Sequence, residues 1–308
     1  MGNPTEAGIA PSLADAPAPP PYTETDNARQ YTNGSAAPAI PAPSYSEAGA
    51  STSTNKIAGV SNRFPPTLNA YLQKKGMSKT FHLGEHAETP LFSVSMHSGW
   101  TGKPMLNLKS GPNNTDPVLA TANDESRWSG KNAIIQIFAP EEGSAAGSSS
   151  SSRSPQPTTT VKMTHKTGWR HATFSFSADV GLGKDTRRED FEWRHSRSED
   201  IKELDKHSWG WKLVRLGSQA EGQGGDRATR SSGVSSDGKE IVAIWTMNGK
   251  WSMNKAFKFQ YFGSALTGMM GERFAIVALM TALKMWYQEY VASTSAATAG
   301  AAGAGAAC

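Results

Sequence analysis

The C-terminal stretch at residues 271–292, GERFAIVALMTALKMWYQEYVA, constrains the fold of this chain more than any other segment. No charged residue lies between Phe274 and Leu283, and apolar side chains would point in every direction around a helix. A helix that is hydrophobic on all sides must be buried, in a protein core or in a membrane. The uncharged run is about half of the roughly 20 residues that span a bilayer. We therefore expect a helix enclosed by the rest of the protein.

The two ends of the chain differ in composition from the middle. Residues 1–61 are rich in Pro, Ala, Ser and Thr and contain neither Phe nor Trp, and residues 293–308 are almost only Ala, Gly, Ser and Thr. Such segments bury too little apolar surface to offset their chain entropy. The sequence predicts disordered tails at 1–61 and 293–308. Between them it predicts one large domain at 62–292, with low-complexity surface insertions at 140–157 and 217–238.

The net charge of +4 is unevenly distributed. Residues 1–60 hold five acids and two bases, a net of −3, so the remaining 29 bases and 22 acids give +7. A basic domain suits an anionic partner, such as a membrane surface or nucleic acid. The alternative is a mildly basic, solvated surface.

Cysteine use and the N-terminus indicate a cellular compartment. Cys308 is the only cysteine, so an intrachain disulfide is impossible, which fits a reducing environment. The first thirty residues lack the basic start and apolar core of a signal peptide. We expect a cytoplasmic protein that associates peripherally with membranes.

A short motif stands out in the N-terminal tail. Pro19, Pro20 and Tyr22, with Pro21 between them, match the PPxY pattern that WW domains bind in aromatic grooves. The motif predicts recruitment of a WW-domain protein such as a HECT-type ubiquitin ligase. Pro41-Ala42-Pro43-Ser44-Tyr45 lacks the adjacent prolines and is not a second copy. The alternative for Pro19–Tyr22 is a Pro-rich linker without a partner.

Short segments of strand character, separated by Gly, Pro, Asn and Asp, fill the domain before the helix. Several alternate with period two, as Phe257, Phe259 and Tyr261 do, whereas 133–138 is nearly continuously apolar and suggests cover on both faces. The predicted strands are 68–74, 80–85, 91–96, 105–109, 118–122, 133–138, 159–165, 171–177, 189–195, 209–216, 240–247 and 256–262.

Twelve antiparallel strands in one sheet would close to remove their edges. Eight strands is about the number whose side chains alone fill a barrel, so a twelve-stranded barrel needs a plug. The terminal helix is the only segment apolar enough to serve. The predicted fold is therefore mainly β: a closed antiparallel β-barrel of about twelve strands around a buried hydrophobic C-terminal α-helix.

This pattern resembles the tubby C-terminal-like superfamily, which includes tubby proteins, phospholipid scramblases and LURP-one-related proteins. The resemblance covers 62–292 and is closest to fungal tubby-like proteins of unknown function. It is carried by the strand count, by Phe191-Glu192-Trp193 and Trp211-Lys212-Leu213-Val214, and by the helix FAIVALMTALKMW. The resemblance implies the barrel-and-helix fold and phosphoinositide binding through basic surface side chains.

No residue here can be matched to the lipid-binding positions of that superfamily. Among the basic residues, Arg187 and Arg188 are our candidates for an anionic-lipid site, because guanidinium groups fit phosphates in two-point geometry. The alternative is that the bases are scattered and only solubilise the surface.

The sequence does not favour an enzyme, a metal site or a cofactor. His82 and His86 have metal-site spacing only if they lie on a helix, and the other histidines show no clustering. Gly181-Leu182-Gly183-Lys184 departs from the phosphate-binding loop and is interpreted as a turn. The acidic run 199–205 is interpreted as a solvated helical turn or loop.

These observations favour a non-enzymatic binding module or adaptor. In this hypothesis the barrel binds phosphoinositide membranes and the PPxY tail recruits its WW-domain partner. Two alternatives stay open: a scramblase-like lipid transporter, in which the terminal helix would span the bilayer, and a nucleic-acid-associated regulator. Nucleic acid is disfavoured because no basic run exceeds two residues and no recognition module is present.

Overall fold

The computed structural model describes residues 63–72, 80–98, 102–126, 131–138, 156–168, 172–206, 209–220, 224–225, 231–247 and 257–304, with side chains as far as Ser293. The predicted tail at 1–61, and with it the PPxY motif, lies outside these residues, as does most of the predicted insertion at 140–157.

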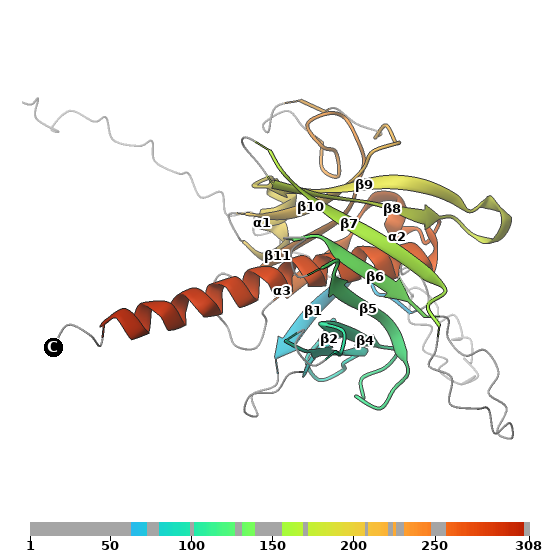
Figure 1. Ribbon diagram of the computed structural model, residues 1–308. Coiled ribbons are helices and arrows are strands. Elements are labelled where there is room, and N and C mark those ends of the chain that lie inside the picture. The colour runs from blue at the N-terminus through green and yellow to red at the C-terminus, as the bar shows by residue number, and fades with distance from the viewer. Residues whose placement is uncertain are drawn as a thin grey trace, which may run out of the picture. The chain divides into compact units, whose positions relative to one another are not determined.

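Twelve antiparallel strands form a closed barrel, as predicted (Figure 1). Each strand pairs with its neighbours in the chain, and β1 closes the barrel by pairing with both β2 and β12. The strands are β1 (Thr67–Leu72), β2 (Thr80–Gly84), β3 (Phe92–Met96), β4 (Leu106–Lys109), β5 (Val118–Asp124), β6 (Ala133–Ile137), β7 (Thr159–Thr167), β8 (Ala172–Val180), β9 (Arg187–Ser196), β10 (Gly210–Arg215), β11 (Ile241–Met247) and β12 (Phe257–Tyr261).

The hairpin formed by β8 and β9 is longer than predicted. β8 continues to Val180 rather than ending at 177, and β9 begins at Arg187 rather than at 189. Ala178 and Val180 are buried and extend the inward-facing series of Phe174 and Phe176. The alternation of apolar residues therefore carries the pairing outward until Val180 faces Arg187.

Helix α3 (Gly271–Ala304) runs through the barrel, as the opening stretch of the sequence predicts (Figure 1). From Phe274 to Leu283 every side chain is at most 3% exposed. The helix continues to Ala304, beyond residue 292, where the sequence placed the end of the domain. Among the helices of the described residues, none is both long and apolar enough to cross a membrane.

Aromatic side chains of the strands fill the space around α3. The Phe191 ring packs against Phe274, with 4.8 Å between centroids, and Phe81 meets Trp286 edge-on at 5.2 Å. Two of the polar side chains that enter this core are paired, as buried groups usually are, whereas the buried Trp245 Nε1 has no hydrogen-bond partner among the described residues. Trp193 Nε1 donates to Thr281 Oγ1 at 3.0 Å, and the Tyr261 hydroxyl donates to the Ala275 carbonyl at 2.9 Å.

Two short helices lie outside the barrel, α1 (Glu199–Asp205) and α2 (Gly263–Leu266). The acidic run is helical, but it is not fully solvated, because Ile201 and Leu204 pack on Ile241 and Ile244 of β11. β11 is consequently buried on both faces. The same prediction for 133–138 is wrong, since β6 alternates between buried and half-buried residues.

Lys284 is the largest departure from the predicted apolar helix. It marks the end of the uncharged run in the sequence, yet its side chain is fully buried inside the barrel. Its ammonium donates to Asp124 Oδ1 at 2.7 Å, from the end of β5. Burial lowers the pKa of Lys284, and the hydrogen bond and negative charge of Asp124 oppose that shift. The pair therefore lets a cation occupy the barrel.

This pair yields a stability prediction. Asp124→Asn leaves the Lys284 ammonium buried without its counter-charge, and loss of one partner of a buried pair destabilises by roughly 3–5 kcal/mol. Because the Asp124 side chain is 35% exposed, we expect the lower end of that range in urea unfolding. In a Lys284→Met background the same substitution should change the free energy of unfolding by under about 1 kcal/mol. Equal losses in both backgrounds would contradict the assignment.

Candidate functional site

The candidate site lies at the end of the barrel where α3 begins. We call it the hairpin rim: residues 180–188 of the β8–β9 hairpin together with residues 263–273, which contain α2, the following loop and the first turn of α3. Gly181 N donates to the Met270 carbonyl at 3.1 Å and joins the two segments. Gly271 has φ +82°, and a Cβ there would lie 2.6 Å from the Gly181 carbonyl oxygen. Glycine is thus required where the hairpin meets the helix.

Apolar side chains are exposed on the hairpin rim. Leu182 is 63% exposed and Met269 is 62% exposed, whereas the next most exposed large hydrophobic residues of the described part, Val291 and Leu91, reach only 40% and 38%. Because strand direction alternates around the barrel, the turn that holds Leu91 lies at the same end. Glu85 and Glu88 precede Leu91 in that turn. Asp179, Asp185 and Glu272 line the hollows beside Leu182, so the exposed apolar surface centred on Leu182 and Met269 is bordered by charges of both signs.

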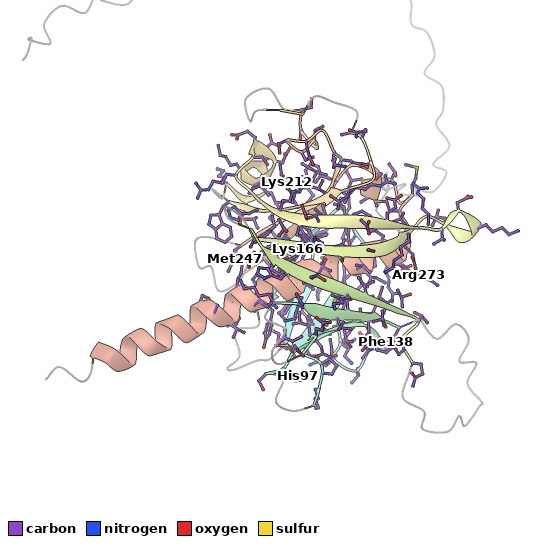
Figure 2. The ribbon with its side chains drawn as sticks, turned by 45° about the horizontal axis from the view of Figure 1, so that its top comes forward. His97, Phe138, Lys166, Lys212, Met247 and Arg273 are labelled. Atoms are coloured by element: carbon purple, nitrogen blue, oxygen red, sulfur yellow. The ribbon has the colours of Figure 1, made fainter. Side chains whose placement is uncertain are left out.

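Two hollows flank the Leu182 side chain. One, of about 380 Å³, lies beside the start of α3 and is lined by Phe138, Ile276 and Arg273 among others. The other, of about 330 Å³, is lined by Met269, Met270 and Arg187 among others. Figure 2 shows Phe138 and Arg273 at this end of the barrel and Met247 at the opposite end. The rim is thus an uneven surface in which a projecting leucine separates two shallow depressions.

The predicted lipid residues Arg187 and Arg188 both lie on the hairpin rim, at the start of β9. Their side chains are 64% and 61% exposed. Arg187 Nε donates to Glu189 Oε1 at 2.5 Å, and Arg188 lies 3.7 Å from Asp179. Successive strand residues face opposite sides, so the two guanidinium groups do not converge, and each has a carboxylate partner. Their role in lipid binding stays a prediction.

Lys184 and Arg273 are the rim cations that the sequence analysis did not single out. Both are exposed, and within the described residues neither forms an ion pair. Asp185, also exposed, lies beside Lys184. The rim therefore carries a small positive excess close to its exposed apolar side chains.

A partly buried charge cluster connects the elements beneath the rim. Arg215, at the end of β10, donates to both oxygens of Glu189, at 2.5 and 2.8 Å, and to Glu240 Oε2 at 3.1 Å. The hydrogen bond from Arg215 is the main cause that lowers the pKa of Glu189. Glu240 in turn accepts from the Ser264 backbone N at 2.6 Å. The cluster thereby joins β9, β10, the residue before β11 and α2, and no sequence pattern signalled it because it depends on strand register.

The structure also bears on the predicted turn at 181–184 and on the histidines. Gly181-Leu182-Gly183-Lys184 lies in the β8–β9 connection, with a single 3-10 turn at Gly183–Asp185, so its interpretation as a turn is confirmed. In the part of the chain that the structure describes, no three His, Cys, Asp or Glu side chains gather as metal ligands. His171 and His207, and the motif residues Pro19, Pro20 and Tyr22, lie outside that part.

The opposite end, where α3 leaves the barrel, has a different character. We call it the exit mouth: Asp124, Lys131, His165 and Trp211 around α3 residues 284–290. Trp211 Nε1 donates to Glu289 Oε1 at 3.2 Å, and Gln288 Nε2 donates to the Lys131 carbonyl at 3.3 Å. Burial raises the pKa of Glu289 to about 7, against the hydrogen bond from Trp211 and the positive charge of Lys131.

No protein-family model, curated protein or solved structure matches this chain. The fold class is defined by the barrel and its helix. Membership of the tubby-like superfamily stays a prediction from the sequence.

Proposed function

We propose that this protein is a non-enzymatic binding module whose hairpin rim docks on an anionic membrane surface. Its N-terminal Pro19–Tyr22 motif would meanwhile recruit a WW-domain protein. The observation that carries the membrane contact is the pair of exposed apolar side chains, Leu182 and Met269, next to Lys184 and Arg273. Peripheral membrane binding depends on this combination of buried apolar area and attraction to anionic lipids.

The magnitudes favour the apolar side chains as the main source of affinity. Full burial of a Leu or Met side chain contributes about 1.5–3 kcal/mol, whereas a basic residue near an anionic leaflet contributes about 1 kcal/mol. Leu182 lies between Gly181 and Gly183, on a hairpin tip held to the α2–α3 loop, so it is displayed without a large neighbour. Lys184 and Arg273 can then meet headgroup phosphates beside the inserted side chains.

Because α3 fills the barrel, we expect a partner to bind at the rim and not in the interior. The space along the barrel axis is occupied by α3, and the two hollows described above open at the rim. Exposed apolar side chains bordered by cations occur there and fit a surface of mixed apolar and anionic character better than a small molecule held in the core.

Liposome flotation tests the membrane contact. Leu182→Asp/Met269→Asp should lower partition onto liposomes that contain phosphatidylserine or a phosphoinositide at least tenfold, because it removes two insertable side chains and adds negative charge. Val291→Asp alters an exposed apolar residue of α3 outside the hairpin rim and should leave partition unchanged.

A second double variant in the flotation experiment tests the contribution of charge. Lys184→Glu/Arg273→Glu should weaken binding to anionic liposomes but not to pure phosphatidylcholine, and added salt should shrink the difference. Flotation of the Leu182/Met269 variant at the wild-type level would refute the proposed contact.

A pull-down with an isolated WW domain tests the tail. Tyr22→Ala should abolish recovery of the full-length protein, because the aromatic groove grips the tyrosine at the end of a polyproline segment. Tyr45→Ala is the matched control, since it follows prolines that are not adjacent, and it should bind like wild type. Equal recovery of the Tyr22 variant and wild type would remove the adaptor half of the proposal.

A further inference from the structure

The exit mouth contains two ionisable side chains of α3 in contrasting environments. Lys284 enters it fully buried and meets its counter-charge, Asp124, at 2.7 Å. Glu289, a turn and a half further along, has no ion pair among the described residues. Its Oε1 accepts from Trp211, and its Oε2 is buried without a hydrogen-bond partner there. An ionised carboxylate in this position would lack the contacts that normally offset burial.

We propose that the exit mouth is a proton-operated latch, in which Glu289 seats the last enclosed turn of α3 against β10 while it is protonated and loosens that turn when it ionises. A neutral carboxyl group can accept the Trp211 hydrogen bond and rest against an aromatic wall. That wall includes Trp211, which meets the Phe174 ring edge-on at 5.5 Å. Among the described residues, an anion at the same place has one hydrogen bond, from Trp211, and no ion pair.

The charged groups around Glu289 come from several elements. Asp124 on β5 is engaged with Lys284, and Lys131, just before β6, is exposed and acts on Glu289 only through its positive charge. Within the described part of the barrel wall, His165 on β7 and His195 on β9 also carry titratable side chains at this end, and the His195 ring meets Trp211 edge-on. Among the described residues of β8, β10, β11 and β12, no acid or base faces inward at this end.

The direction of the pH effect follows from Glu289. Its pKa is about 7 when seated, against 4.5 as the ordinary value, so the seated turn holds the proton more tightly than the released turn does. The stabilisation of the seated turn by protonated Glu289 is therefore fully present below pH 4.5 and is lost as the pH rises through 7. Release of the turn is favoured across that interval.

His165 acts in the opposite direction. Its pKa is lowered, first by burial and then by the positive charge of Lys131, so its protonation below its ordinary value of 6.5 favours release. The latch is therefore tightest at weakly acidic pH, between the two effects. Release would uncover the aromatic surface of Trp286 and Tyr290, whose rings stack at 5.5 Å.

Hydrogen exchange of the full-length protein tests the latch. The readout is the protection of backbone amides 286–293, each corrected for its intrinsic exchange rate, in wild type and in Glu289→Gln. The Gln variant keeps an acceptor for Trp211 and cannot ionise. The wild-type-to-variant ratio of protection factors should fall about tenfold between pH 6 and 8.5, which is the change for a carboxyl group with these two pKa values. The contribution of His165 cancels in this ratio, because both proteins contain His165.

Two controls keep the result interpretable. Glu272→Gln alters an exposed carboxylate of the same helix at the hairpin rim, paired with Arg63, and should retain the wild-type pH dependence. Amides 276–283 should keep their protection throughout, since the latch opens locally. A ratio that stays constant with pH would overturn the proposal. An equal loss of protection in 276–283 would also overturn it, because the effect would then be global unfolding.

Discussion

The enclosure of α3 by the barrel is the constraint on which the rest of the structure depends. A closed sheet of twelve strands has no unpaired edge, but its interior is too wide for its own side chains to fill. A helix that is apolar on every side has no stable position in water. Each element therefore supplies what the other lacks, and the contacts of Phe191 with Phe274 and of Phe81 with Trp286 are where the two meet.

Threading a helix through a barrel also creates two unlike ends. At the hairpin rim α3 begins at Gly271, packed against a hairpin tip that displays Leu182, and a partly buried charge cluster around Arg215 connects the neighbouring elements. At the exit mouth the helix must pass from an apolar interior to water, and the first charged residues after Arg273, Lys284 and Glu289, are buried and partly buried there. The first end offers a surface for binding, and the second offers groups whose protonation can be coupled to the seating of the helix.

The architecture was predictable because it depends on patterns along the chain. Short segments of strand character between turn residues, several of them alternating with period two, located all twelve strands, and the run from Phe274 to Leu283 identified the enclosed helix. The sites were less predictable because they depend on register and on which strands become neighbours. Asp124 and Lys284 are 160 residues apart. The partners Glu189 and Asp179, which engage Arg187 and Arg188, emerge only once the β8–β9 pairing is known. In the sequence Leu182 is an ordinary turn residue, and only its exposure in the structure identifies it as a candidate contact residue.

The central claim is that the barrel and α3 are each other's core, and urea unfolding of Ala278→Asp beside Ala292→Asp tests it most directly. Ala278 is fully buried in the middle of the barrel, and Ala292 is exposed on the same helix. An unpaired buried carboxylate destabilises by several kcal/mol, comparable to the whole stability of a typical domain. Ala278→Asp should therefore lose the cooperative transition, and Ala292→Asp should unfold within about 0.5 kcal/mol of wild type. A cooperative transition near the wild-type midpoint in Ala278→Asp would contradict the enclosed-helix account.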